Sequence, residues 1–333
     1  MLGLALKKLG AFEELQLGEV PDPILGANDV LVEVQATSVN FADTLLIGGG
    51  YQFKPNFPFI PGKCPAGVVR EIGPKVKNFK LGDRVLTLAE IGGFGQFVAV
   101  NASQCFLLPP SMSCIDAASM ASVFDTAWIA LRERARMKAG ETLLVLGGSS
   151  GIGLAATQLA KAMGGVVLSA IANPSKSQLV IAAGADVVID CLENNLNPGL
   201  REHIFAATEG NGVNVAIDML GGDAFDAAIR TIAWDGRIVI VGFASGRIPS
   251  IKANYLLLKN IAVSGMQISD YHRRRPEITA QCWQDIFSLY TANRIRPLNT
   301  VVWPLSRCVD ALVSLQTRSA PGRIVLQQGS VPE

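Results

Sequence analysis

Histidine is scarce in this chain of 333 residues, which contains only two, His203 and His272. A Ser-His-Asp triad requires a histidine placed beside the nucleophile, and common zinc sites combine histidines with cysteines. Both kinds of site are therefore hard to build here. The six cysteines are scattered without a Cys-x-x-Cys pair. This spacing predicts reduced, mostly packed thiols in a cytoplasmic protein.

The chain also lacks an excess of positive charge, because it contains 29 basic and 28 acidic residues. Nucleic-acid binders usually carry a basic excess or stripe. The densest run, Arg273-Arg274-Arg275, is short enough to be a solvated loop. We see no apolar stretch of about 18 residues and no signal peptide at the N-terminus. We therefore expect neither nucleic acid nor a membrane as a partner.

The pattern of short strands and helices predicts two domains. Apolar residues make up 49% of the chain, enough for sizeable cores. The first third contains short strands between glycines and prolines, which favours a small barrel or sandwich. From about residue 117, strands alternate with helices, which predicts a parallel, doubly wound sheet. The expected strands are 142–146, 166–172, 187–190, 213–218, 237–241 and 261–263, and the expected helices are 152–163, 175–183, 198–207 and 224–233.

After about residue 264 we expect one long helix and a closing strand, 322–326, that returns to the first domain. The predicted β-rich domain thus comprises residues 1–116 and 264–333. The nucleotide-binding domain, residues 117–263, is inserted in it.

A glycine-rich turn follows the first strand of this alternating series. The apolar run 143–146 leads into the turn and then into a helix. Glycines permit positive φ and close approach of the backbone to a pyrophosphate, and the helix N-terminus favours the anion. A strand, a glycine loop and a helix in this order predict a dinucleotide site. Its expected residues are Gly148, Ser149, Ser150, Gly151, Ile152 and Gly153.

The end of the second strand of the series indicates the cofactor. It lacks the Asp or Glu that receives the ribose 2′-hydroxyl of NAD and is followed instead by Asn173, Ser175 and Lys176. One cation with hydroxyls suits a 2′-phosphate, which favours NADPH over NADH. Two further corners follow strands of the same sheet and are expected to line the cofactor site: Leu220 and Gly221, and Gly242, Phe243 and Ala244.

Together these motifs resemble the zinc-free medium-chain dehydrogenase/reductases, in the quinone oxidoreductase (ζ-crystallin-like) branch. The resemblance covers essentially the whole chain. Its most specific part runs from Pro58-Phe59-Ile60-Pro61-Gly62 through Ala66-Gly67-Val68-Val69 to Gly82-Asp83-Arg84-Val85. It implies a Rossmann domain, whose parallel sheet is doubly wound, inserted in a GroES-like β-rich catalytic domain. It also implies a homodimer.

The resemblance also implies roles for individual residues. Asn40, Asp43 and Tyr51 are expected to line the substrate site, with Tyr51 as the best hydrogen-bond donor to the substrate. Thr126 is expected near the nicotinamide. Independently of the resemblance, we expect Arg318 to reach the cofactor, with a surface arginine as the alternative. Zinc-dependent members of the superfamily carry Gly-His-Glu where this chain has Gly62-Lys63-Cys64. Zinc requires three or four converging ligands, so we expect no metal site.

These features predict an NADPH-dependent oxidoreductase that transfers hydride to a quinone without zinc. A reductase of enones, 2-alkenals or enoyl thioesters is the first alternative, and a non-catalytic, crystallin-like NADPH-binding protein is the second. The glycine turn and the pair Tyr255 and Lys259 also resemble short-chain dehydrogenases. In those enzymes, however, the glycine motif stands at the N-terminus, so we interpret this pair as coincidence.

Overall fold

The computed structural model describes residues 1–191 and 196–328. Its chain forms two compact units. Unit 1 comprises Met1–Ser122, Ser269–Phe287 and Arg296–Glu333, and unit 2 comprises Val123–Ile268 and Ser288–Ile295. Both contain segments distant in sequence, because the chain leaves unit 1 for unit 2 and then returns.

Unit 1 contains a seven-stranded sheet and a two-stranded sheet. The large sheet has the order β14-β15-β3-β4-β5-β7, with β6 also paired to β3. All its pairs are antiparallel except β14 with β15. Its strands are β3 (Asp29–Ser38), β4 (Ala66–Ile72), β5 (Arg84–Thr87), β6 (Phe97–Asn101), β7 (Cys105–Leu107), β14 (Thr300–Pro304) and β15 (Arg323–Gln327); β1 (Leu2–Ala5) pairs with β2 (Gln16–Glu19).

The helices of unit 1 pack around this sheet. Alternate residues Val30, Val32 and Val34 of β3 are buried in one hydrophobic cluster, as expected for a strand with two different faces. A second cluster joins α1 to α11. The helices are α1 (Phe41–Ile47), α2 (Cys114–Met120) and α11 (Cys308–Gln316), together with most of α9 (Ile268–Arg274) and α10 (Pro276–Thr291).

Unit 2 is a six-stranded sheet in which every pair is parallel. Its order is β10-β9-β8-β11-β12-β13. The chain begins at a central strand, β8, and winds outward first in one direction and then in the other, which is the doubly wound arrangement. The strands are β8 (Thr142–Leu146), β9 (Val166–Ile171), β10 (Val187–Asp190), β11 (Val213–Asp218), β12 (Ile232–Ile240) and β13 (Ala262–Gly265).

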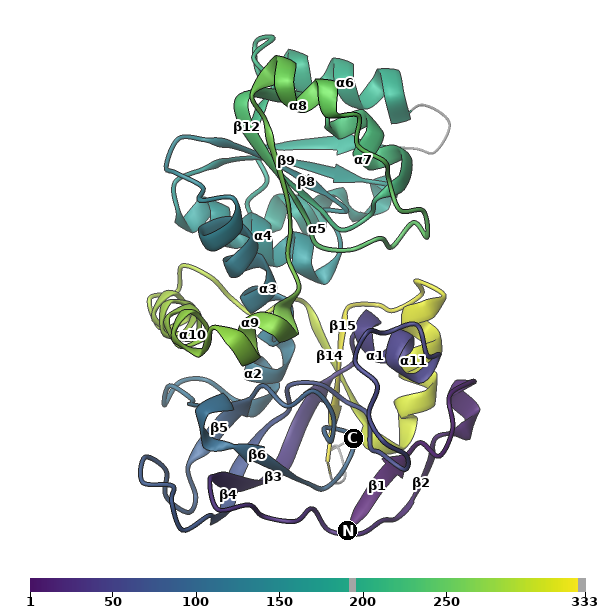
Figure 1. The fold of residues 1–333 in the computed structure, drawn as a ribbon, viewed down its shortest axis with the longest axis vertical. Helices are drawn as coiled ribbons and strands as arrows, with labels where there is room; N and C mark the ends of the chain where they lie inside the picture. The colour runs from purple at the N-terminus through teal and green to yellow at the C-terminus, as the bar shows by residue number, and fades with distance from the viewer. Residues whose placement is uncertain (192–195, 329–333) are drawn as a thin grey trace. The chain divides into compact units, whose positions relative to one another are not determined.

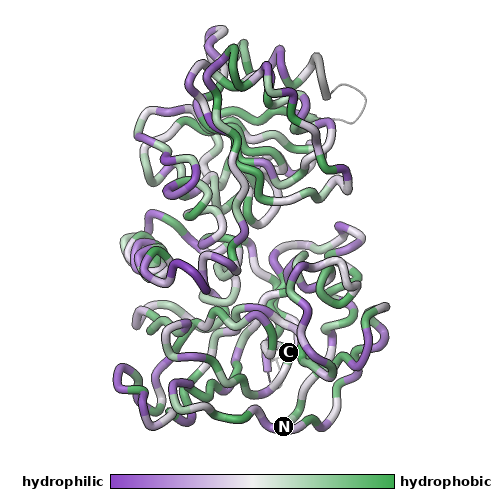
Figure 2. Tube along the Cα trace, in the orientation of Figure 1, coloured by the Kyte–Doolittle hydropathy of each residue, from purple (hydrophilic) through white to green (hydrophobic). Residues whose placement is uncertain are grey.

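Helices cover both faces of this sheet (Figure 1). On one face, α6 and α7 pack on Leu144, Leu146 and Leu168, and on the other α4 contacts β8, β9 and α3. Strands buried on both faces are apolar along their length, as Figure 2 shows. The helices of the unit are α3 (Phe124–Ile129), α4 (Gly151–Ala162), α5 (Ser177–Ala182), α6 (Leu196–Ala207), α7 (Gly222–Ala228) and α8 (Ala253–Lys259), with a π-helical turn at Ala130–Arg134.

The predicted α/β fold class is confirmed, and two local expectations are wrong. The helix expected over 224–233 ends at Ala228, and residues from Ile232 onward begin β12. Ile232 pairs with Val213 and is buried. Its spacing from Ala224 and Ala228 fits a helix as well as a strand, so the apolar pattern did not distinguish the two.

The segment after 264 was expected to contain one helix and one strand, but it also forms α9, α11 and β14. β14 pairs in parallel with the closing strand β15. Among the described residues, no single helix is long and apolar enough to cross a membrane; one bent pair, Cys114–Met120 with Phe124–Arg134, meets that test only when taken together.

Candidate functional site

The predicted glycine turn lies in unit 2, at the carboxyl end of β8. The backbone N–H groups of Gly147 and Gly148 both donate to the carbonyl of Ala170 on β9, at 3.1 and 2.9 Å. Gly147 has φ of +83°, which favours glycine. The Ser150 hydroxyl accepts a hydrogen bond from the Gly153 N–H at 3.1 Å and caps α4. The turn is thus fixed between two strands and the start of a helix.

The space around this turn fits a dinucleotide. A Cβ on Gly153 would lie 2.5 Å from the carbonyl oxygen of Gly147, so the helix can pack closely on the turn only with glycine at this position. A Cβ on Gly148 would lie 1.8 Å from the Ser169 hydroxyl. That hydroxyl is buried and has no hydrogen-bond partner within the described chain. Close backbone packing beside a helix N-terminus is the arrangement that admits a pyrophosphate.

The residues predicted to select NADPH follow β9, the strand next to β8. Asn173 accepts hydrogen bonds from the Ser175 N–H at 3.0 Å and from the Ser175 hydroxyl at 2.7 Å. These contacts fix a short 3-10 turn, Pro174–Lys176. Ser175 is exposed and Lys176 half-buried. A hydroxyl and an ammonium group are therefore both available near the solvent at the carboxyl end of β9.

The two remaining corners lie along the same sheet edge, after β11 and β12. Asp218 is buried and accepts from the N–H groups of Leu220 at 2.8 Å and Gly221 at 3.0 Å. Burial raises the pKa of Asp218, although both N–H groups oppose the shift. The Ala244 N–H donates to the Met219 carbonyl at 3.0 Å and joins the two corners.

The structure therefore brings most of the predicted cofactor residues to one edge of the sheet in unit 2. The corner after β12 also contains Gly242 and Phe243, whose ring is 40% exposed. Thr126 is buried in α3 of the same unit. Arg318 is exposed and follows α11 in unit 1. The nicotinamide contact of Thr126 and the cofactor contact of Arg318 remain predictions.

The rival pair Tyr255 and Lys259 lies at the opposite edge of the sheet. The Lys259 ammonium donates to the carbonyls of Arg230 at 2.7 Å and Ile232 at 3.0 Å, where β12 begins. The glycine turn follows the other end of the parallel strands. The pair therefore does not lie beside this turn.

In unit 1, Asn40 and Asp43 form a buried hydrogen-bonded corner at the start of α1. The Asn40 N–H donates to the Asp43 carboxylate at 2.8 Å, which caps the helix. The side-chain oxygen of Asn40 accepts from Arg323 at 2.7 Å. The other carboxylate oxygen of Asp43 has no hydrogen-bond partner among the described residues. Burial raises the pKa of Asp43 to about 6. Both residues thus have a structural task, and their contact with substrate remains a prediction.

Tyr51 lies after α1, with its side chain 9% exposed. Its hydroxyl accepts a hydrogen bond from the Lys63 ammonium at 3.2 Å and lies 3.4 Å from the Ser269 hydroxyl. Lys63 also forms an ion pair with Glu90. Our sequence interpretation assigned no role to Lys63 and Ser269, the two neighbours of Tyr51, or to Glu90, the partner of Lys63. The signal available for Lys63 was a lysine at the position where related enzymes carry a zinc-ligating histidine.

The donors in unit 1 do not suit a metal ion. A protonated lysine has no lone pair to offer, and Lys63 is held in its charged form by Glu90. Across residues 1–191 and 196–328, no group of three or more His, Cys, Asp or Glu side chains could hold a metal. The absence of a zinc ligand set was expected from the sequence and stays a prediction for the protein in solution.

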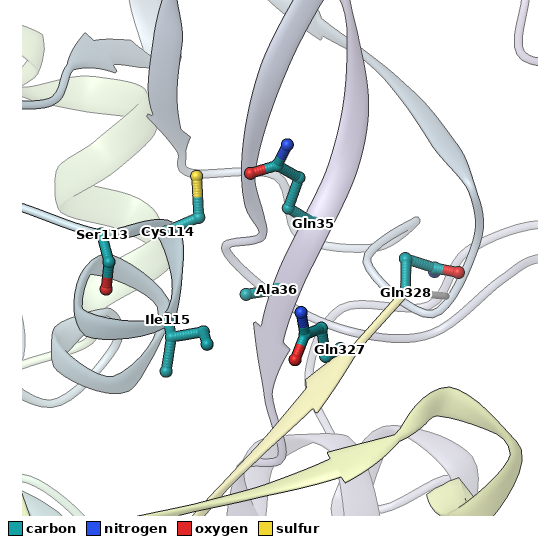
Figure 3. Close-up of a pocket in the computed structure, with 7 residues that line it drawn as sticks. All are labelled: Gln35, Ala36, Ser113, Cys114, Ile115, Gln327 and Gln328. Atoms are coloured by element: carbon teal, nitrogen blue, oxygen red, sulfur yellow. The ribbon is translucent and has the colours of Figure 1, made fainter. Parts of the chain in front are cut away.

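A polar hollow of about 330 Å³ also lies in unit 1, between β3, β15 and the start of α2. Gln35 and Gln327 project from the two strands, and Cys114 lies on the helix (Figure 3). None of its lining residues is a predicted site residue. We therefore assign it no part in the reaction.

Two family models match the chain. The model described as "Alcohol dehydrogenase GroES-like domain" matches residues 26–110, and that described as "Zinc-binding dehydrogenase" matches residues 151–284. Quinone oxidoreductase-like protein 2 of Rattus norvegicus is 32% identical over 315 residues, which cover 94% of this chain and 89% of that protein.

Solved structures agree with these matches. A probable oxidoreductase from Mycobacterium abscessus is similar with a TM-score of 0.87 and 33% identity, over 98% of both chains. A mycobacterial protein solved in complex with NADPH has a TM-score of 0.88 and 27% identity, over 98% of this chain and 100% of that one.

Proposed function

The chain belongs to the medium-chain dehydrogenase/reductase family, in its quinone oxidoreductase branch, and on this premise we propose that it catalyses NADPH-dependent reduction of a quinone without zinc. The observation that carries the proposal is the sheet edge of unit 2. There a capped helix N-terminus, tightly packed glycines and a cation after the second strand lie together. Medium-chain relatives include a mycobacterial protein whose structure contains NADPH.

The residues of unit 2 have distinct tasks in this proposal. Gly148, Ser149 and Gly151 receive the pyrophosphate at the start of α4, where N–H groups and the helix dipole favour an anion. Lys176 and Ser175 bind the 2′-phosphate of the ribose by charge-assisted hydrogen bonds. When bound, NADPH supplies a hydride. Asp218 keeps the corner with Gly221 in position through two backbone N–H groups.

The residues of unit 1 act on the substrate. A quinone spreads negative charge over a conjugated system when it accepts hydride, so it depends less on a Lewis acid than a simple carbonyl does. A hydrogen-bond donor can then stabilise the developing oxyanion. Tyr51 is that donor in our proposal, with Asn40 and Asp43 fixing the segment that carries it. The zinc independence rests on the charged Lys63 in the place of a ligand.

The test is reduction of two acceptors in parallel, 9,10-phenanthrenequinone and a simple enone, with NADPH and with NADH. We expect turnover of the quinone and a preference for NADPH. Turnover of the enone alone would favour the alkene reductase alternative. NADPH binding without reduction of either acceptor would favour the non-catalytic alternative. A homodimer and a cytoplasmic location remain predictions from the sequence.

A further inference from the structure

Lys63 is a buried charge beside the candidate proton donor. Its side chain is 3% exposed. The ammonium group lies 3.2 Å from the Tyr51 hydroxyl and 4.9 Å from the centre of the tyrosine ring. It also lies 3.3 Å from the Ser269 hydroxyl, which is itself 3.4 Å from the Tyr51 hydroxyl. The three polar groups of Lys63, Tyr51 and Ser269 therefore lie within hydrogen-bond distance of one another in unit 1.

The backbone around Lys63 fixes its direction. Gly62 has φ of +95° and Cys64 has φ of +52°, so the lysine stands in a tight turn. A Cβ on Gly62 would lie 2.6 Å from Phe94, which restricts this position to glycine. The Cys64 N–H donates to the Ala89 carbonyl at 2.9 Å, which holds the turn beside the loop that carries Glu90. The lysine and its carboxylate partner are thus positioned by the same backbone contacts.

The charges around Lys63 keep it protonated. Burial is the largest single effect and would lower the pKa of Lys63, but the effects that raise it, led by the negative charge of Glu90, together outweigh burial and hold the pKa above its usual range. Cys64 and Tyr51 add to this upward shift. Asp43 also faces Lys63, and beyond it lie Arg323 and Cys308. Lys63 is therefore a poor acid and a permanent positive charge at the pH of an assay.

We propose that Lys63 is a positioning residue for Tyr51: it holds the phenol as the proton donor of the reaction and stabilises the tyrosinate left after proton transfer. This inference rests on the proposed function. The acceptor gains a hydride, and the proton of the Tyr51 O–H bond is transferred to the acceptor anion. The tyrosinate then takes a proton from water. The acceptor thus gains one hydride and one proton, and the tyrosine is restored.

The position of the cation explains why tyrosine can serve as the acid. A phenol is a weak acid near neutral pH, and an opposite charge within about 4–6 Å favours its ionised form. Lys63 supplies this charge at hydrogen-bond distance, and Glu90 prevents the buried ammonium from losing its proton. Ser269 supplies a second hydroxyl that orients the phenol. The substrate class implied is an acceptor that takes up one proton with the hydride.

The test compares the wild type with K63M, K63R, Y51F and the double variant K63M/Y51F. In K63M we expect kcat to fall about 100-fold, within the range typical of general acid catalysis, with NADPH affinity changed less than about twofold. K63R retains the charge and should recover a large part of kcat. Because both residues act in one step, K63M/Y51F should lose little more than Y51F. The proposal would be overturned if the loss of kcat in K63M/Y51F equalled the product of the losses in K63M and Y51F. An unchanged kcat in K63M would also overturn it.

Two further measurements separate this proposal from its alternatives. The variant K63M/E90Q removes the carboxylate that K63M leaves unpaired, so it tests whether misfolding explains the loss. The environment of the Tyr51 phenol can be read at one pH from ultraviolet difference spectra between each protein and its Y51F counterpart. We expect the Tyr51 absorption band to shift when Lys63 is replaced by Met, because the phenol oxygen loses its charged hydrogen-bond donor. An unshifted band would overturn the inference even if the wild type reduced no acceptor, whereas a shifted band without turnover would count against the proposed function alone.

Discussion

The hydroxyl of Ser169 lies 1.8 Å from the position that a Cβ on Gly148 would occupy. Ser169 stands on β9 and Gly148 in the turn after β8, so the serine leaves room only for a bare backbone. Packing against Ser169 is one reason for a glycine at position 148. Close approach of the backbone to the pyrophosphate of a bound dinucleotide is a second reason. These two reasons can be separated by experiment.

We predict that G148A weakens NADPH binding by about tenfold or more and destabilises unit 2 by about 1–3 kcal/mol, as expected for overpacking. The double variant G148A/S169G removes the clash and should restore thermal stability but not NADPH affinity. Titration of NADPH together with thermal unfolding measures both. G18A is the control, because a Cβ on Gly18 has no atom within 4 Å. Recovery of binding in the double variant would show that the glycine serves packing only.

Lys176 should discriminate between the two nicotinamide cofactors. We predict that K176A raises the Kd for NADPH about tenfold, equivalent to about 1.4 kcal/mol, and changes the Kd for NADH little. The reason is that only NADPH carries the 2′-phosphate that the ammonium binds. K77A, which removes an exposed lysine in unit 1, is the matched control. Equal weakening of both cofactors would contradict the assignment.

Arg323 should contribute strongly to the stability of unit 1. Its guanidinium is part-buried and donates to groups from β3, α2 and the segments beside them: the carbonyls of Ser119, Val39 and Ala121, the Ser38 hydroxyl and the Asn40 side chain. We predict that R323A lowers the free energy of unfolding by about 3 kcal/mol or more, because these buried acceptors lose a charged donor.

R323K retains the charge but not the planar fork, so it should restore the stability only in part. The control R70A removes an exposed ion pair with Glu33 and should change stability by less than about 1 kcal/mol. Calorimetric unfolding measures all three variants. An effect of R323A no larger than that of R70A would contradict the structural role given to this arginine.

The carboxyl of Asp43 should make stability depend on pH. Burial raises its pKa from 3.8 to about 6, against the opposing effects of the Asn40 N–H and the Lys63 charge. Between these values the folded chain binds more protons than the unfolded one, so this group's contribution to stability falls as pH rises through the interval. The full loss above about pH 6 is about 3 kcal/mol.

We therefore predict that D43N gains stability relative to the wild type as pH rises from about 4 to about 7. Asparagine keeps an oxygen that can accept from the Asn40 N–H but carries no charge. Denaturant unfolding of both proteins at the two pH values provides the comparison. Parallel pH dependence of the two proteins would show that Asp43 does not titrate in this way.

The sequence contains most of the information on unit 2. The strand at Thr142–Leu146 is predicted with its observed ends, because Thr142 and the apolar run of four residues after it are bounded by a glycine on each side within three residues. The glycine turn is found for the same reason, since strand, turn and helix follow one another along the chain. The end of α7 is not predicted, because its apolar spacing continues into β12.

Unit 1 shows what sequence patterns cannot give. Asn40 and Asp43 are near each other in the chain, so their corner can be anticipated as a helix cap. Lys63 and Ser269 reach Tyr51, and Glu90 reaches Lys63, only in the folded chain, and Ser269 lies 218 residues from Tyr51 in the sequence. Local sequence patterns do not predict contacts between residues so far apart in the chain. The sequence shows Lys63 as a departure from the family pattern, but it does not predict which residues Lys63 contacts.

The most direct test of the proposed zinc-independent reduction is oxidation of NADPH by 9,10-phenanthrenequinone in protein treated with a metal chelator. The decrease in absorbance of the reduced nicotinamide gives the rate, and protein treated identically without chelator gives the reference. We predict turnover that is the same in both samples and is unchanged by added zinc. Turnover that disappears with the chelator and returns with zinc, or no turnover in either sample, would contradict it.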